Sequence, residues 1–230
     1  MNVNGLQKLT LLDYPGKVAC TAFLAGCNLR CPFCHNSELL DGTAEAVMDD
    51  AGLLEFLKKR QGMLDGVAVT GGEPLLRPEL PELLRRIRAL GYSVKLDTNG
   101  TLPAALERVL AADLVDYVAM DVKNSPERYA ETCGVETMDL APVYASIDLL
   151  RSGAVDYEFR TTVVSELHDE ASFAAIGSMI EGAKRYFLQP FTDRDTVAFA
   201  GFHAPDTAAL QRYAEIVRPF VEAVEIRGDA

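Results

Sequence analysis

The 230-residue sequence lacks the features of several common functional classes. It has no apolar run that could cross a bilayer, for which about 20 consecutive apolar residues are needed. Basic side chains are in the minority, because 22 lysines and arginines stand against 34 acidic residues, for a net charge of -12. A basic patch is the usual footprint of a surface that binds nucleic acid or an anionic membrane. We therefore expect neither a nucleic-acid partner nor a membrane partner.

Signs of an oxidising compartment are also lacking. The first ten residues have neither the apolar core nor the small-residue cleavage site of a secretory signal peptide. The chain has only five cysteines, whereas secreted proteins that are stabilised by disulfides are rich in them. We expect a cytoplasmic protein with reduced thiols.

No internal repeat, low-complexity segment or linker divides the chain, so we expect one domain over residues 1–230, which is long enough to bury a full core. Short apolar runs alternate with stretches of helical periodicity. Strands are expected at 18–26, 66–70, 92–98, 116–123, 157–164 and 185–190, and helices at 49–60, 80–90, 102–112, 143–150, 173–180 and 210–220. About six βα units without a glycine-rich dinucleotide fingerprint predict an α/β fold, a single-domain partial (β/α)6 barrel of the TIM type.

The cysteines are concentrated in one short stretch, AGCNLRCPFCHN at residues 25–36, which contains Cys27, Cys31 and Cys34. Buried cysteines that act as small hydrophobic residues scatter along the chain, and a disulfide would leave one thiol over. CPFCH fits the c-type haem attachment pattern, but that pattern belongs to exported proteins and does not need Cys27. With His35 the three thiols could form a zinc site, although structural zinc ligands usually come in two separated pairs. A 4Fe-4S cluster with three thiolates would leave one iron free for a substrate.

Unusual residues also follow the next three expected strands. TGGEP (70–74) ends the second strand, LDTNG (96–100) the third and MDVKN (120–124) the fourth. Each segment alone could be a turn or a helix cap. In parallel α/β barrels, however, the chemistry lies on the loops at the carboxyl ends of the strands. The four segments together therefore predict one site, with the cysteine loop after the first strand.

The spacing Cys27-x3-Cys31-x2-Cys34, with Phe33 before the last cysteine and GGEP further on, resembles the radical S-adenosylmethionine (SAM) superfamily. The CHN ending, DTNG and DVK resemble activating enzymes for glycyl-radical proteins. The opening segment GLQKLTLLDYPGKVACTAFLAGCNLRCPFCHN is most similar to the longer form of the anaerobic ribonucleoside-triphosphate reductase activating proteins.

This resemblance implies a radical SAM oxidoreductase that cleaves SAM reductively to a 5'-deoxyadenosyl radical and removes a hydrogen atom from a glycine of a partner enzyme. Anaerobic ribonucleoside-triphosphate reductase is the implied partner, and a flavodoxin- or ferredoxin-type protein the implied electron donor. The alternatives are activation of another glycyl-radical enzyme, such as one of the pyruvate formate-lyase type, and a radical enzyme acting on a small molecule. A structural zinc protein is the remotest alternative. The polar segment 123–136 is the expected docking rim for a partner protein, with a solvated surface loop as the alternative.

The resemblance also implies which residues hold the cofactors. Cys27, Cys31 and Cys34 would hold three irons of a 4Fe-4S cluster, and the fourth iron would bind SAM. The implied SAM contacts are Phe33, Gly71, Gly72, Glu73, Pro74, Asp97, Lys123 and Val163. Related activases hold a monovalent cation at the positions of Asp97, Thr98 and Asp121. Such a cation makes electrostatic sense, because clustered carboxylates would otherwise repel the carboxylate of SAM.

The chain departs from the family pattern in one place. Related pyruvate formate-lyase activators carry a ribose-binding histidine where this sequence has Thr192, so the resemblance assigns no ribose contact at that position. Cys20 and Cys133 are interpreted as residues that do not bind the cluster, and His168 and His203 as loop or cap residues. No second cysteine cluster indicates an inserted ferredoxin-like domain.

Overall fold

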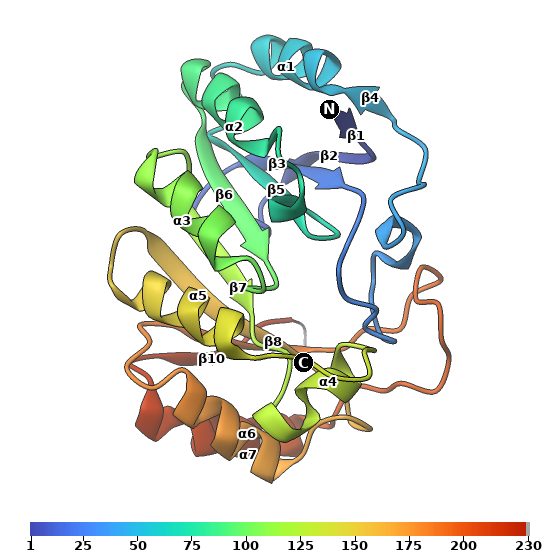
Figure 1. Cartoon of the computed structure of the whole chain (residues 1–230), viewed down its shortest axis with the longest axis vertical. Coiled ribbons are helices and arrows are strands. Elements are labelled where there is room, and N and C mark those ends of the chain that lie inside the picture. The colour runs from blue at the N-terminus through green and yellow to red at the C-terminus, as the bar shows by residue number, and fades with distance from the viewer. Residues whose placement is uncertain (229–230) are drawn as a thin grey trace. The chain divides into compact units, whose positions relative to one another are not determined.

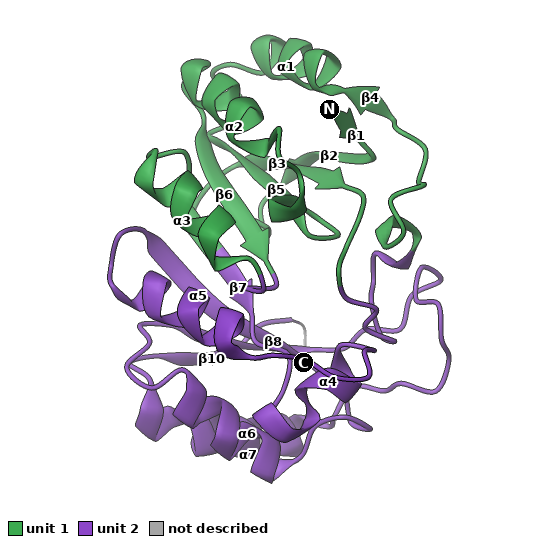
Figure 2. Ribbon diagram, in the orientation of Figure 1, with its two compact units in different colours: residues 1–28, 38–98, 102–118 green, residues 29–37, 99–101, 119–230 purple. Residues whose placement is uncertain are grey.

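The computed structural model describes residues 1–228, which form two compact units (Figures 1 and 2). Unit 1 comprises Met1–Asn28, Glu38–Thr98 and Leu102–Val118, and unit 2 comprises Leu29–Ser37, Asn99–Thr101 and the residues from Ala119 onward. Eight strands form a mostly parallel sheet in the order β10-β9-β8-β7-β6-β5-β3-β2. The expected α/β fold class is therefore confirmed, while the single domain over 1–230 stays a prediction.

Unit 1 is built around three parallel strands. Its strands are β1 (Asn2–Val3), β2 (Gly5–Thr10), β3 (Ala19–Leu24), β4 (Met48–Asp49), β5 (Gly66–Gly71) and β6 (Ser93–Thr98). β3, β5 and β6 are parallel, β2 pairs antiparallel with β3, and β1 and β4 form a separate antiparallel ribbon. Nearly every residue of β3 is buried, as expected for a parallel strand with both faces covered.

The helices of unit 1 follow from the spacing of their leucines. They are α1 (Asp50–Lys59), α2 (Leu80–Ala89) and α3 (Pro103–Ala111). The 3-10 turn η1 (Ser37–Leu39) begins in unit 2 and ends in unit 1, and the 3-10 turn η2 (Pro74–Leu76) follows β5. In α2, Leu80, Leu83, Leu84 and Ile87 are all buried on one face, as the helical period requires. α1 begins where the carboxylate of Asp49 accepts a hydrogen bond from the Gly52 N–H, at 2.7 Å.

Unit 2 repeats the strand and helix alternation. β7 (Tyr117–Asp121) begins in unit 1 and ends in unit 2. The other elements of unit 2 are β8 (Asp156–Val163), β9 (Tyr186–Pro190), β10 (Val224–Ile226), α4 (Tyr129–Thr132), α5 (Ala141–Arg151), α6 (Glu170–Met179), α7 (Thr207–Val217), η3 (Pro126–Arg128) and η4 (Arg218–Phe220). β8, β9 and β10 are parallel. α6 and α7 lie side by side (Figure 1), where the rings of Phe173 and Tyr213 stack at 4.4 Å.

All six expected strands and all six expected helices are present, and the sequence did not reveal several short elements. The strand expected first is the third in the chain, because β1 and β2 precede it. β4, β10 and α4 were also not expected. Within residues 1–228, no helix is both long and apolar enough to span a membrane.

Candidate cofactor site

In unit 1 the loop that carries Cys27 lies directly against the GGEP loop after β5. The Gly72 N–H donates to the carbonyl of Leu24 at 2.8 Å. A Cβ at Gly72 would stand 2.2 Å from the carbonyl oxygen of Gly26, and a Cβ at Gly71 would meet the carbonyl oxygen of Leu24 at 2.3 Å. Gly71 also has a φ of +118°, which side-chain-bearing residues rarely adopt. Both glycines are therefore required by close packing of main chain on main chain.

Glu73 holds the GGEP loop to the end of β6. Its side chain is almost fully buried, and its carboxylate accepts hydrogen bonds from the Leu75 N–H at 3.1 Å and the Thr98 hydroxyl at 3.0 Å. The Glu73 N–H also donates to the carbonyl of Gly26 at 2.8 Å. Glu73 thus caps the short turn that begins at Pro74. The structure brings Glu73, Pro74 and Thr98 together, as the sequence predicted for residues at the carboxyl ends of neighbouring strands.

Asp97 has a basic partner that sequence reasoning did not anticipate. Lys95 precedes it by two residues on β6, so that both side chains lie on the same face of the strand. The Lys95 ammonium is buried, with 1% of the residue exposed, and forms an ion pair with the Asp97 carboxylate. Burial of an ammonium group is costly unless it is paired. The sequence could have indicated this ion pair through the i, i+2 spacing of opposite charges in an expected strand.

Cys31 and Cys34 lie in unit 2 at the two ends of one turn, closed by a 3.1 Å hydrogen bond from the Cys34 N–H to the Cys31 carbonyl. None of the five cysteines forms a disulfide. A hydrogen bond from Cys133, together with the positive charge of Lys123, lowers the pKa of the Cys31 thiol to about 7 despite its burial. The thiolate is the form that binds metals, so this environment suits a cluster ligand.

Asp121 and Lys123 form a largely buried ion pair at the end of β7, with 22% and 14% of their side chains exposed. The Lys123 ammonium lies 2.8 Å from one Asp121 oxygen, and the Arg160 guanidinium donates to the other oxygen at 2.5 Å. Burial opposes ionisation of Asp121, but the charges of Arg160 and Lys123 outweigh it and hold the pKa of this carboxyl well below its usual range. Asp121 in turn raises the pKa of Lys123, against the effect of burial. Arg160, which sequence reasoning missed, belongs to this group of charges.

The segment 191–206, between β9 and α7, lies over the cysteine loop within unit 2. The His35 ring stacks on Phe191 with 5.3 Å between ring centroids, and its Nε2 lies 2.7 Å from the Thr192 carbonyl oxygen. Phe33 is 4% exposed and meets Phe202 edge to face at 6.4 Å. The predicted adenine contact at Phe33 therefore lies beside an aromatic ring that no motif indicated.

His168, expected as a loop or cap residue, lies in the loop between β8 and α6 and is buried there. Its Nδ1 accepts from the Val164 N–H at 3.1 Å, and its Nε2 then carries the proton and donates to the Lys123 carbonyl at 2.9 Å. Burial lowers the pKa of His168. His168 thus joins the Lys123 carbonyl to the main chain of Val164, which follows Val163, the fully buried last residue of β8. His203 is exposed and pairs with Glu166 at 2.7 Å.

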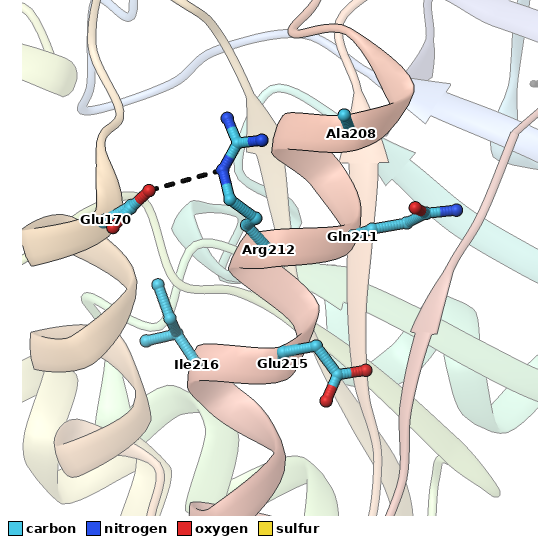
Figure 3. Close-up of a pocket in the computed structure, with 6 residues that line it drawn as sticks. All are labelled: Glu170, Ala208, Gln211, Arg212, Glu215 and Ile216. Carbon is cyan, nitrogen blue, oxygen red and sulfur yellow. Dashed lines mark ion pairs between the residues drawn. The ribbon is translucent and has the colours of Figure 1, made fainter.

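A surface hollow on α6 and α7 lies apart from every predicted site residue (Figure 3). It is lined by Glu170, Ala208, Gln211, Arg212, Glu215 and Ile216. The Glu170 carboxylate and the Arg212 guanidinium form an ion pair at 3.3 Å beside it. With its charges paired and no nucleophile or metal-binding cysteine or histidine in its lining, this hollow does not contribute to the candidate site.

The residues fit an iron-sulfur cluster better than the alternatives drawn from the sequence. The donors are three thiols outside any disulfide, and the pKa of Cys31 is lowered to about 7, which favours its thiolate. In a zinc site His35 would be the fourth ligand, but its Nε2 already contacts the Thr192 carbonyl and its ring stacks on Phe191.

Comparison with known proteins identifies the family. The Radical SAM superfamily matches residues 21–171, about two thirds of the chain and including the cysteine loop. The chain belongs to the radical SAM superfamily. It is therefore a radical SAM enzyme, and its cofactors are a 4Fe-4S cluster and SAM.

The sequence relatives indicate which group of radical SAM enzymes this chain is similar to. A Methanocaldococcus jannaschii protein named "Putative glycyl-radical enzyme activating enzyme" is 31% identical over 98% of this chain and 95% of its own length, which places the chain in that family. A pyruvate formate-lyase-activating enzyme from Clostridium pasteurianum is 30% identical, over 53% of this chain and 52% of its own. A 7-carboxy-7-deazaguanine synthase from Methanopyrus kandleri is 28% identical, over 84% and 83%.

Solved structures agree on the fold of the radical SAM enzyme. A domain of a pyruvate-formate lyase-activating enzyme from Bacteroides vulgatus matches with a TM-score of 0.58 and 20% identity, over 71% of this chain and 99% of that domain. Streptococcus suis SuiB bound to the precursor peptide SuiA matches with a TM-score of 0.69 and 15% identity, over 90% of this chain and 48% of SuiB. These identities support the predicted fold class of the radical SAM enzymes and carry no statement about substrate.

Proposed function

We propose that this radical SAM enzyme activates a glycyl-radical enzyme by removing a hydrogen atom from a glycine of that partner. The observation that carries the proposal is the similarity to the M. jannaschii protein, which runs through nearly the whole length of both chains. The similarity to the C. pasteurianum pyruvate formate-lyase-activating enzyme supports the same reaction.

When bound, the cluster and SAM supply the 5'-deoxyadenosyl radical that takes the glycine hydrogen. In this proposal Cys27, Cys31 and Cys34 hold three irons. The chain orients SAM through the main chain of the GGEP loop, which Gly71 and Gly72 allow to pack directly on the main chain of Leu24 and Gly26. The remaining proposed SAM contacts are Phe33, Glu73, Pro74, Asp97, Lys123 and Val163. A monovalent cation beside Asp97, Thr98 and Asp121 belongs to the same proposal.

The favoured partner is anaerobic ribonucleoside-triphosphate reductase, on the resemblance of the opening segment to activating proteins of that reductase. The electron donor is a flavodoxin- or ferredoxin-type protein, and the reaction takes place in the cytoplasm. The docking rim is the segment 123–136, whose residues Asn124 and Tyr129 are buried while Glu127 and Glu131 are exposed. Its inner side is therefore packed against the rest of unit 2, and its outer side is polar, with Glu131 paired to Arg128 and Glu127 exposed. Such a surface would suit a loop of a partner protein.

The test is to mix the reduced, cluster-loaded protein with SAM and the reductase of the same organism without oxygen. A glycyl radical should appear by electron paramagnetic resonance, and deuterium placed on the reacting glycine should be found in 5'-deoxyadenosine. The Cys31→Ala variant is the control for background radical formation. A radical on a different glycyl-radical enzyme alone would reassign the partner. No radical on any such protein would refute the proposal.

A second candidate is supported by the several relatives named 7-carboxy-7-deazaguanine synthase. One of them is 44% identical, but over 35% of this chain and 34% of its own length, and the M. kandleri protein extends further at 28%. Expression of this chain in cells that lack such a synthase decides the matter. Recovery of 7-carboxy-7-deazaguanine would favour this small-molecule reaction, and its absence would favour the activating enzyme.

A further inference from the structure

Cys133 is the one cysteine outside the motif that contacts a motif cysteine in the described structure. It follows α4 directly and is fully buried, and its thiol is hydrogen-bonded to that of Cys31. Cys20, the other cysteine outside the motif, lies within β3, where burial raises the pKa of its thiol to about 12.

The main chain fixes the distance between Cys133 and Cys31. The Arg30 N–H, one residue before Cys31, donates to the Cys133 carbonyl at 2.8 Å. On the other side of Cys133, a Cβ on Gly134 would stand 2.0 Å from the Arg30 carbonyl oxygen. Gly134 has a φ of +66° and ends α4, with its N–H donating to Glu131 at 3.0 Å. The end of α4 is therefore docked on the cysteine loop through main-chain contacts that tolerate no side chain at position 134.

The direction of the thiol hydrogen bond follows from valence. A cysteine that binds iron has lost its proton, so the sulfur of Cys31 can only accept. Cys133 keeps its proton and must donate. We propose that Cys133 is a positioning residue that donates an S–H hydrogen bond to the cluster ligand Cys31 and thereby raises the reduction potential of the 4Fe-4S cluster.

The physical reason is the electron density on the ligand sulfur. A donor to a cluster sulfur stabilises the additional negative charge of the reduced state, and hydrogen bonds to sulfurs are among the factors that set cluster potentials. Lys123 acts on Cys31 in the same sense through its charge, but it shares that charge with Asp121. Cys133 is the neutral donor, so its effect can be removed without changing the charge of the site.

The experiment is a potentiometric titration of the reconstituted protein, followed by electron paramagnetic resonance, for the parent and the variants Cys133→Ala, Cys133→Ser and Cys20→Ala. We expect Cys133→Ala to keep its iron and to show a lower midpoint potential. A tenfold decrease in the equilibrium constant for reduction would correspond to about 59 mV for this one-electron step. Cys133→Ser keeps a donor and should stay close to the parent. Cys20→Ala removes a buried thiol of equal size and should not shift the potential.

Three results would overturn the proposal. Equal shifts in Cys133→Ala and Cys133→Ser would show an effect of packing rather than of the donated proton, and no shift in either would show no effect at all. Loss of iron from Cys133→Ala as complete as from Cys31→Ala would make Cys133 a ligand instead of a donor. The measurement requires neither a glycyl-radical partner nor SAM turnover, so the proposed activating function can fail while this inference stands.

Discussion

At the scale of single residues, the three thiols of the cysteine loop differ in their surroundings. Cys31 is buried and hydrogen-bonded to Cys133, whereas Cys27 and Cys34 are partly exposed. If all three thiols bind iron, the loss of any one of them should remove the cluster whatever its exposure, because the two thiolates left are too few protein ligands. The thiols therefore offer a test that separates cluster ligands from other cysteines.

We predict that anaerobic reconstitution gives a brown protein with about four irons per chain. Alanine at Cys27, Cys31 or Cys34 should abolish the bound iron and its visible absorption. Alanine at Cys20, which is equally buried but lies within β3, is the matched control and should retain the cluster. Iron analysis and absorption spectra check the result. Stoichiometric zinc with no cluster would contradict it.

The charges around Asp121 give a second residue-scale prediction. Both oxygens of Asp121 contact cationic side chains, so Asp121→Ala leaves Lys123 and Arg160 without their shared partner. Breaking a buried ion pair in this way costs about 3–5 kcal/mol. We expect a large loss of SAM cleavage and, if a monovalent cation is bound here, loss of the response to sodium or potassium that the parent shows.

The measurement for Asp121 is methionine and 5'-deoxyadenosine formation with sodium, with potassium and with no added cation. Asp113→Ala removes a carboxylate that is largely exposed and is the control for a simple change in net charge. Equal activity under all three conditions, in the parent as in Asp121→Ala, would rule out the proposed cation site.

At the scale of elements, two loops pack so closely on each other that neither can move without the other. The loop after β3 and the loop after β5 share main-chain hydrogen bonds, and the nearest neighbours of Gly72 are backbone atoms of Gly26. Main chain cannot move aside as a flexible side chain can. An added methyl group at this point must therefore displace a loop.

We predict that Gly72→Ala destabilises the protein by about 3 kcal/mol, at the upper end for overpacking, and impairs SAM cleavage. Gly62→Ala is the control, because Gly62 has a φ of +77° but nothing within 4 Å of an added Cβ. It should cost about 1–2 kcal/mol, from the left-handed backbone alone. Thermal unfolding compares the two, since about 1 kcal/mol shifts Tm by about 2–4 °C at this chain length. A smaller shift for Gly72→Ala than for Gly62→Ala would contradict the close packing.

The sequence predicted elements whose period was strong and missed those whose pattern was short or polar. α2 was predictable because Leu80, Leu83, Leu84 and Ile87 recur at helical spacing. β2 was not, because its Gln7 and Lys8 are exposed on an edge strand, and β10 has only three residues. The motifs indicated which loops carry the site. The pairing of Asp121 with Arg160 could not be read from the chain, because the two residues are 39 positions apart and meet only in the fold.

At the scale of the whole chain, the superfamily match ends at residue 171, while the similarity to the M. jannaschii protein extends over 98% of the chain. The contacts of Phe202 with Phe33 and of Thr192 with His35 come from the segment beyond that match. This is why the shared motifs gave no indication of what covers the cysteine loop.

Stability of the whole molecule should depend on two histidines, His168, which is buried, and His35, which is partly buried. Burial lowers the pKa of His168 and of His35 below the ordinary value of 6.5. As the pH falls through 6.5, the unfolded chain takes up protons at these rings before the folded chain does. The free energy of unfolding contributed by the neutral rings is thus fully present above that pH and is lost as the pH falls. The pKa values of Asp121 and Asp169 are also lowered, but these two carboxylates change the free energy of unfolding only as the pH falls through their ordinary pKa of 3.8.

We predict that His168→Gln lowers stability by about 1–2 kcal/mol near pH 7.5, because the Val164 N–H or the Lys123 carbonyl loses its partner, and by less near pH 5.5. The reason is that the parent, but not the variant, has by then lost the contribution of a neutral buried ring. Thermal midpoints of the cluster-loaded proteins, measured without oxygen by circular dichroism, give the two differences. His203→Gln is the control, because that ring is exposed. Parallel pH profiles for the parent and His168→Gln would mean that the folded protein protonates His168 as readily as the unfolded chain does. The assignment of His168 as a buried, neutral ring that positions Lys123 would then be wrong.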